Sequence, residues 1–281
     1  LWWVDVKRAK LHRYNPRTGN TRRYDLPLRA SAIALYEGSF LMVGDREVGV
    51  YDPSTEVYDT LLSVETEPEG NRTNDGGVAP DGSFWFGTMD GGLNRYVPET
   101  DSFVHYTGNS DDTTRLASSQ AWTLYEDRDG VVWVGTNLGF SRYERDRDSF
   151  TSYRILPLGT DRPSNEWVSA FVQDRLGRFW VGTLGGGMFE FDQTEGFLRQ
   201  ISRVDGLSSD MVCGILEDDD GFLWVSTFEG ITRFDPRSGS CNIYDETNGL
   251  PGRQFNRFTA ALKSRKGELL FGAVEGLLIV D

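Results

Sequence analysis

The sequence is poor in the residues on which metal sites, disulfide frameworks and acid–base catalysis most often depend. Its 281 residues contain 2 Cys, 2 His and 4 Met. Two cysteines cannot form a disulfide framework, and no group of His, Cys and Asp residues has the spacing of a zinc site. No Gly-x-Ser-x-Gly motif is present, so Ser/His/Asp catalysis has no recognisable signature.

Positive charge and long apolar runs are also scarce. Lys and Arg number 29 against 43 Asp and Glu, which gives a formal net charge of −14. Nucleic acid binding needs a basic face, and a membrane helix needs ~18 consecutive apolar residues. We therefore expect neither nucleic acid nor a membrane as a partner. Because residue 1 is a Leu inside an apolar run, we also expect a chain trimmed within a longer one.

Glycine and aromatic residues are abundant, with 32 Gly, 8 Trp, 11 Tyr and 17 Phe, and they recur at regular intervals. Four tryptophan-centred segments share one pattern and lie 44 to 48 residues apart: Trp85–Thr88, Trp133–Thr136, Trp180–Thr183 and Trp224–Thr227. Weaker copies are centred on Leu270, Met42 and Trp3. The chain therefore contains seven copies of one repeat.

Each repeat is built from short segments that favour strands. The runs are rich in Val, Phe, Tyr, Trp and Thr and are bounded by Gly, Asp and Pro, without a helical period. Four short strands in a repeat of roughly 40–45 residues are typical of a propeller blade. We predict an all-β chain, residues 1–281 forming a single β-propeller domain of seven four-stranded blades. A six-bladed ring with shared strands is the alternative.

The two ends of the chain are each one strand short of a blade. Residues 1–27 supply three strands without an inner one, and residues 255–281 supply three strands without an outer one. We expect incomplete or rearranged terminal blades. Open strand edges favour pairing between chains, so a homodimer through these edges is a specific expectation.

Residues 1–89 resemble the regucalcin/gluconolactonase/luciferin-regenerating family. The segments that carry the resemblance are Leu1–Val6, Leu11–Pro16, Asn71–Gly76 and Asp81–Met89. Residues 90–281 instead resemble the two-component regulator propeller, the extracytoplasmic sensor repeat of hybrid signalling proteins. Their segments are Gly91–Tyr96, Leu124–Thr136, Asp205–Ser209 and Asn248–Leu277. Both families share the Trp-x-Gly-Thr strand at which the resemblance changes, which suggests a chimera, recombined in nature or engineered; one divergent family is the alternative.

The resemblance to the sugar lactonases implies one divalent cation, usually calcium, in a central channel. Only Arg72 and Asn74 match the motif of that family, because its glutamate, metal-binding Asn and catalytic Asp have no counterparts here. A hard cation needs about six to eight oxygen ligands, and Asn74 with Asp75 makes a poor site. We expect no bound metal and a lost lactonase activity. Arg72 and Asn74 are then polar residues of a loop between blades.

Two further groups of residues have structural explanations. Leu216–Gly221 resembles the start of a calcium-binding loop, but Leu216 and Thr227 stand where carboxylates are needed. Hairpin turns account for this and the other Asp/Gly-rich segments. Cys213 and Cys241 fall on the inner and outer strands of one blade, ~14 Å apart at ~4.8 Å per strand. That separation is too large for a disulfide, so we predict two free thiols.

A short polar or aromatic group precedes each inner strand, and in a propeller such loops converge at one end of the central channel. Convergent Trp, Asn, Arg and carboxylate side chains can bind a small polar ligand or a carbohydrate; satisfying the backbone at the start of each strand is the alternative. The ligand-binding candidates are Arg72, Asn74, Trp122, Asn165, Trp167, Asp210 and Asn256.

These observations predict a non-enzymatic propeller with sensor-type, ligand-binding blades and a vacated lactonase site. A calcium-dependent lactonase or esterase is one alternative, and a protein-interaction propeller without a small-molecule site is another. The sensor resemblance of residues 90–281 implies an extracytoplasmic location. No catalytic residue is assigned.

Overall fold

The computed structural model describes most of the chain. The described residues are 2–5, 8–15, 17–36, 38–44, 47–63, 73–79, 83–97, 100, 102–155, 167–250, 252–257, 260–264 and 266–280. They form β-strands in antiparallel sheets, with a few single-turn 3₁₀ segments. None of the helices described is long and apolar enough to cross a membrane. The all-β prediction is therefore confirmed.

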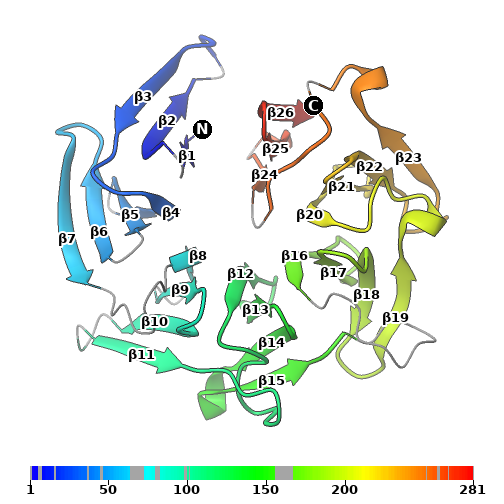
Figure 1. Ribbon diagram of the computed structural model, residues 1–281, viewed down its shortest axis with the longest axis horizontal. Helices are drawn as coiled ribbons and strands as arrows, with labels where there is room; N and C mark the ends of the chain where they lie inside the picture. The colour runs from blue at the N-terminus through cyan, green and yellow to red at the C-terminus, as the bar shows by residue number, and fades with distance from the viewer. Residues whose placement is uncertain are drawn as a thin grey trace. The chain divides into compact units, whose positions relative to one another are not determined.

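Contacts divide the chain into two compact units. Unit 1 is Leu1–Gly108 with Ser119–Leu124, and unit 2 is Asn109–Ser118 with Tyr125–Asp281. Unit 1 holds three sheets (Figure 1). Their strands are β1 (Trp2–Asp5), β2 (Lys10–Tyr14) and β3 (Thr21–Asp25); β4 (Ala30–Tyr36), β5 (Ser39–Gly44), β6 (Glu47–Asp52) and β7 (Val57–Ser63); and β8 (Thr73–Val78), β9 (Phe84–Thr88), β10 (Leu93–Val97) and β11 (Ser102–Tyr106).

The remaining four sheets lie in unit 2, apart from the first residues of β12, which belong to unit 1. Their strands are β12 (Ala121–Glu126), β13 (Val132–Thr136), β14 (Gly139–Glu144) and β15 (Ser149–Tyr153); β16 (Val168–Gln173), β17 (Phe179–Thr183), β18 (Met188–Asp192) and β19 (Gly196–Ile201); β20 (Val212–Glu217), β21 (Leu223–Thr227), β22 (Gly230–Phe234) and β23 (Cys241–Tyr244); and β24 (Ala261–Lys263), β25 (Leu269–Ala273) and β26 (Gly276–Val280).

The order of the strands is that of a β-propeller with seven blades. In each sheet the strands follow one another as antiparallel neighbours in chain order. Five sheets of the described residues have four strands, whereas the first and last have three. Within the described residues, the first sheet lacks an inner strand and the last lacks an outer one, as the sequence predicts for the incomplete terminal blades.

The tryptophans of the repeat pack between neighbouring sheets of unit 2. Trp133 and Trp180 have no exposed surface. The Trp133 ring lies 4.5 Å from that of Phe179 in the next sheet, centroid to centroid. The Trp180 ring lies 5.5 Å from that of Phe234, again one sheet further along. Burying a large aromatic ring is one of the strongest single contributions to a core, so these residues hold successive blades together.

The acidic turn that precedes each tryptophan is tied to it by hydrogen bonds. The carboxylates of Asp127, Asp174 and Asp218 accept from the indole Nε1 six residues later, at 2.8, 3.2 and 2.9 Å. The same carboxylates accept backbone N–H groups two and four residues on. The Asp residues of these turns, including the one within Leu216–Gly221, therefore stabilise the hairpin turn and fix the position of the tryptophan ring.

Both cysteines are free thiols in one sheet, as predicted. Cys213 is buried on β20, and burial raises the pKa of its thiol to about 12. The positive charge of Arg257 lowers this pKa, but by less than burial raises it. Cys241 begins the outer strand β23. Burial, and then the charge of Asp205, also raise the pKa of its thiol.

Candidate functional site

The candidates of unit 1 lie where β8 bulges. The pairing of β8 with β9 shifts register between Thr73 and Gly76, so Asn74 and Asp75 fall in the bulge. Bulges turn side chains away from the regular ladder. Here they turn them toward β12: Asn74 Nδ2 donates to the carbonyl of Ala121 at 2.8 Å. Asp75 Oδ2 accepts the backbone N–H of Leu124 at 2.8 Å.

The donor set of this bulge does not fit a calcium ion. The second carboxylate oxygen of Asp75, Oδ1, accepts the N–H of Gly76 at 2.9 Å, so each oxygen already serves a backbone group. A calcium site needs several carboxylate and carbonyl oxygens directed at one point. Nowhere in the described part of the chain do three or more His, Cys, Asp or Glu side chains form such a group. Arg72, the other residue of this motif, lies outside the described residues.

Trp122 is the third candidate of unit 1, and it lies in the strand β12 itself. Only 7% of its surface is exposed. Its ring therefore contributes mainly to packing. Its neighbour Ala121 is the residue to which Asn74 donates, so these candidates of unit 1 share one contact between β8 and β12.

In unit 2 the candidates precede three different inner strands. Trp167 is half-buried immediately before β16, and its carbonyl accepts the N–H of Leu184 at 2.9 Å. Asp210 precedes β20, and its Oδ1 accepts the N–H of Arg203 at 2.7 Å. Asn256 precedes β24, is exposed, and donates from Nδ2 to the carbonyl of Ala273 at 3.1 Å. Asn165 lies outside the described residues.

The loops before the inner strands also hold the hairpin that joins the second and third strands of a sheet. The carbonyl of Asp210 accepts the N–H groups of Gly185 and Gly187, both at 2.9 Å. Gly187 has φ +74°, and a Cβ at this position would lie 2.2 Å from the carbonyl oxygen of Ile201. Only glycine fits such a position, which explains the Gly that follows the tryptophan segment in the repeat.

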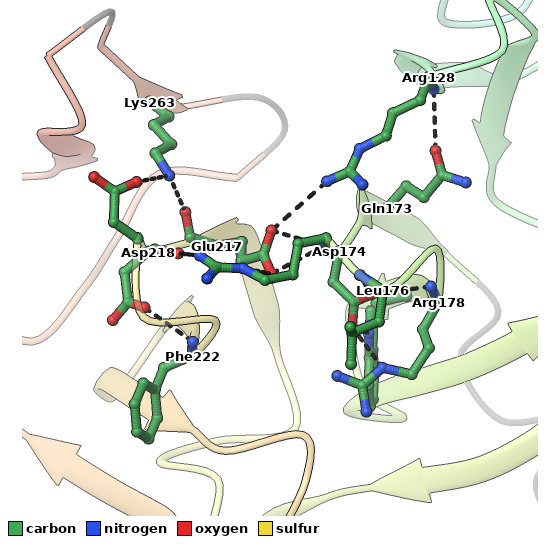
Figure 2. Close-up of polar contacts among 12 residues, drawn as sticks. Arg128, Gln173, Asp174, Leu176, Arg178, Glu217, Asp218, Phe222 and Lys263 are labelled. Carbon is green, nitrogen blue, oxygen red and sulfur yellow. Dashed lines mark hydrogen bonds and ion pairs between the residues drawn. The ribbon is translucent and has the colours of Figure 1, made fainter.

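A series of polar contacts at the opposite ends of the inner strands was not anticipated from the sequence (Figure 2). Gln173, the last residue of β16, accepts the N–H of Arg128 at 3.0 Å. Glu217, the last residue of β20, accepts the N–H and the Nε of Arg175 at 2.9 and 3.1 Å. Each contact joins a strand end to the acidic turn of the preceding sheet.

The third contact of the series has the opposite charge arrangement. Lys263, the last residue of β24, donates from Nζ to Asp219 Oδ1 at 2.7 Å and to the carbonyl of Glu217 at 2.9 Å (Figure 2). The anion is therefore on the turn and the cation on the strand end, the reverse of Arg175 and Glu217. The only sequence signal for this series is the polar residue that ends each inner strand.

Two protein families match separate parts of the chain. The model of the SMP-30/gluconolactonase/LRE-like region matches residues 1–98. The model of the two component regulator propeller matches residues 115–138, 161–185 and 206–229. The resemblance to these two families, and the order in which they occur, are therefore confirmed.

Individual relatives of both kinds also match parts of the chain. The 6-deoxy-6-sulfogluconolactonase of Pseudomonas putida is 33% identical over 90 residues, which are 32% of this chain and 31% of that enzyme. Histidine kinase P4 of Formosa agariphila is 33% identical over 200 residues, 70% of this chain but 14% of the kinase. The chain thus spans a third or less of these relatives. Among solved structures, virginiamycin B lyase of Staphylococcus aureus shares the fold, with a TM-score of 0.73 at 12% identity over 99% of this chain and 89% of the lyase.

Proposed function

We propose that the chain is a non-enzymatic β-propeller module in which lactonase-type and sensor-type blades are combined. In this proposal the loops before the inner strands bind a small polar ligand, and the lactonase metal site is vacated. The main support for the proposal is the hydrogen bonding of Asn74 and Asp75. Both side chains bind the backbone of β12 rather than converging with other oxygen ligands on one metal position.

The sensor role is supported by the part of the chain that most resembles a signalling protein. Three segments between residues 115 and 229 match the regulator propeller, and a histidine kinase is 33% identical over 70% of this chain. A sensor domain needs a ligand that its loops recognise. In unit 2 the loop before β24 exposes Gln254, Asn256 and Arg257, which makes it suited to that task.

A calcium-dependent lactonase is the second candidate function. It is favoured by the family match of residues 1–98 and by a match of 90 residues to a sulfogluconolactonase. It requires metal ligands other than Asn74 and Asp75. Turnover of a sugar lactone that is lost on calcium chelation would support this candidate over the proposed one.

Ligand binding is tested by calorimetric titration of neutral saccharides, sugar acids and short peptides. We expect one saccharide class to bind, and Trp167→Ala to weaken that binding about tenfold, as expected for loss of a large aromatic contact. Leu198→Ala is the matched control, because Leu198 is an exposed apolar residue on the outer strand β19. Binding of no ligand class, or binding unaffected by Trp167→Ala, would contradict the proposal.

A further inference from the structure

Polar side chains at the starts of β8, β12 and β20 are used for the fold. Asp75 accepts the N–H of Leu124, and Gln120 Nε2 donates to Asp90 Oδ1 at 2.7 Å. Asp210 accepts the N–H of Arg203. Their polar atoms have partners within the protein and are less free to bind a ligand.

The loop before β24 differs in this respect. Gln254, Asn256 and Arg257 are all exposed. Asn256 uses its Nδ2 to bind the carbonyl of Ala273 at 3.1 Å, which fixes the direction of its amide. Within the described residues, the Gln254 side chain makes no hydrogen bond and Arg257 has no carboxylate within 4.0 Å. The loop therefore presents a guanidinium and two carboxamides to solvent.

An aromatic ring restrains the guanidinium of Arg257. Its Cζ lies 5.1 Å from the centroid of the Phe228 ring, in the hairpin between β21 and β22. A guanidinium over an aromatic face is held by a cation–π attraction while the edge that carries its N–H groups stays free. Arg257 is thus positioned before any ligand arrives, which lowers the entropic cost of binding one.

Among the described residues, no carboxylate neutralises the charge of Arg257. Glu229 and Glu246 are paired with other arginines, Arg203 and Arg253, at 3.1 Å each. Cys213 lies close enough to interact electrostatically with Arg257, but burial raises the pKa of its thiol to about 12. The thiol is therefore neutral at physiological pH. Glu275, on the hairpin between β25 and β26, lies beside Gly252 and forms no ion pair with Arg257.

We propose that Arg257, Gln254 and Asn256 form a subsite for the carboxylate and adjacent hydroxyl groups of a sugar acid. A guanidinium can bind a carboxylate through two parallel N–H···O bonds. The two carboxamides supply donors and acceptors for hydroxyl groups. This inference rests on the proposed ligand-binding function and specifies its ligand class: an anionic saccharide rather than a neutral one.

The test is calorimetric titration with D-glucuronate and with D-glucose as its neutral counterpart. We expect D-glucuronate to bind at least tenfold more tightly than D-glucose, and its affinity to fall as salt rises from ~0.05 to ~0.5 M because screening weakens charge attraction. Arg257→Gln should abolish the preference for the acid. Arg203→Gln is the matched control, since it removes the same charge from an exposed arginine that already has the partner Glu229.

The outcomes separate this inference from the proposed function. Thermal denaturation of both variants first establishes that each is folded. Equal affinity of wild type and Arg257→Gln for D-glucuronate would overturn the subsite, as would equal loss in Arg203→Gln. If D-glucuronate fails to bind while a neutral saccharide or a peptide binds, the subsite is wrong and the ligand-binding function stands. If none of them binds, both are wrong.

Discussion

Asp174 and Trp180 are joined by a hydrogen bond of 3.2 Å from the indole Nε1 to Oδ2. Both residues are fully buried. The same carboxylate oxygen accepts a hydrogen bond from Arg178 Nε at 2.6 Å. Asp174 therefore accepts hydrogen bonds from a tryptophan, from an arginine and from the backbone of its own turn. In the last sheet Leu270 replaces the tryptophan, and Ser264 replaces the aspartate six residues earlier. Asp and Trp thus occur together or are absent together in the sheets of unit 2.

Removal of the Asp174 carboxylate should be the most destabilising of the polar substitutions in unit 2. Asp174→Ala leaves the Arg178 charge and the Trp180 N–H without their acceptor, and breaking a buried ion pair costs about 3–5 kcal/mol. Urea unfolding followed by tryptophan fluorescence measures the change. Asp146→Ala is the control, because Asp146 is exposed in a single-turn helix. Equal stability of the two variants would contradict the role given to Asp174.

The contacts at the strand ends should differ in strength despite their similar distances. The side chain of Glu217 is 12% exposed and accepts two groups of Arg175, so Glu217→Ala should cost about 1–3 kcal/mol. Asp219 is 79% exposed, so Lys263→Met should cost below about 1 kcal/mol. The free energies of unfolding of the two variants decide this, and a larger loss in Lys263→Met would show the ranking by burial to be wrong.

Asp75 is expected to matter for local stability and not for ligand binding. Asp75→Ala deprives the N–H of Leu124 of its acceptor, at a cost of about 1–2 kcal/mol. Hydrogen exchange at the Leu124 amide should therefore speed up about tenfold or more, while exchange at β20 of unit 2 stays unchanged. Unaltered exchange at Leu124 would show that the contact of 2.8 Å does not hold β12 in place.

The buried thiol of Cys213 predicts a loss of stability at alkaline pH. Its pKa rises from 9.0 to about 12 on folding. The stabilisation is fully present below pH 9 and is lost as the pH rises toward 12, because the unfolded chain releases the proton first. Several tyrosines have raised pKa values as well, so Cys213→Ala is the comparison: its stability should fall less steeply over this pH range. A parallel decline would contradict the prediction.

Modification by a thiol reagent at pH 8 gives an independent check on the two cysteines. Cys213 is fully buried, whereas Cys241 is partly accessible. The thiolate is the reactive form, so we expect one slow reaction per native chain, at Cys241, and two after denaturation. Reaction of both thiols in the native protein would contradict the buried position of Cys213.

The fold could be predicted from the sequence because its determinants recur. Trp133, Trp180 and Trp224 mark one strand of each sheet, and the turn residues mark its neighbours. The contacts of individual side chains could not be predicted in the same way. Asn74 is a site candidate because it matches the lactonase motif, and Asp75 is a weak metal candidate beside it, but a bulge turns both toward β12. The position of a bulge depends on how two strands pair, and a short sequence motif does not reveal that pairing.

The strand-end contacts and Arg257 were missed for a related reason. Glu217 and Arg175 are 42 residues apart, and nothing in either segment indicates the other. Arg257 stands next to the candidate Asn256, yet its significance comes from the Phe228 ring and from the lack of a carboxylate partner among the described residues. Such properties depend on which segments are neighbours in the folded chain.

The proposal that the chain is a binding module and not a lactonase is tested most directly by the hydrolysis of D-glucono-1,5-lactone. The protein is treated with a chelator and then assayed with and without added calcium. We predict that hydrolysis equals the spontaneous rate in both conditions and is unchanged by Asn74→Ala. Calcium-dependent turnover above that rate, lost on chelation and in Asn74→Ala, would contradict the account.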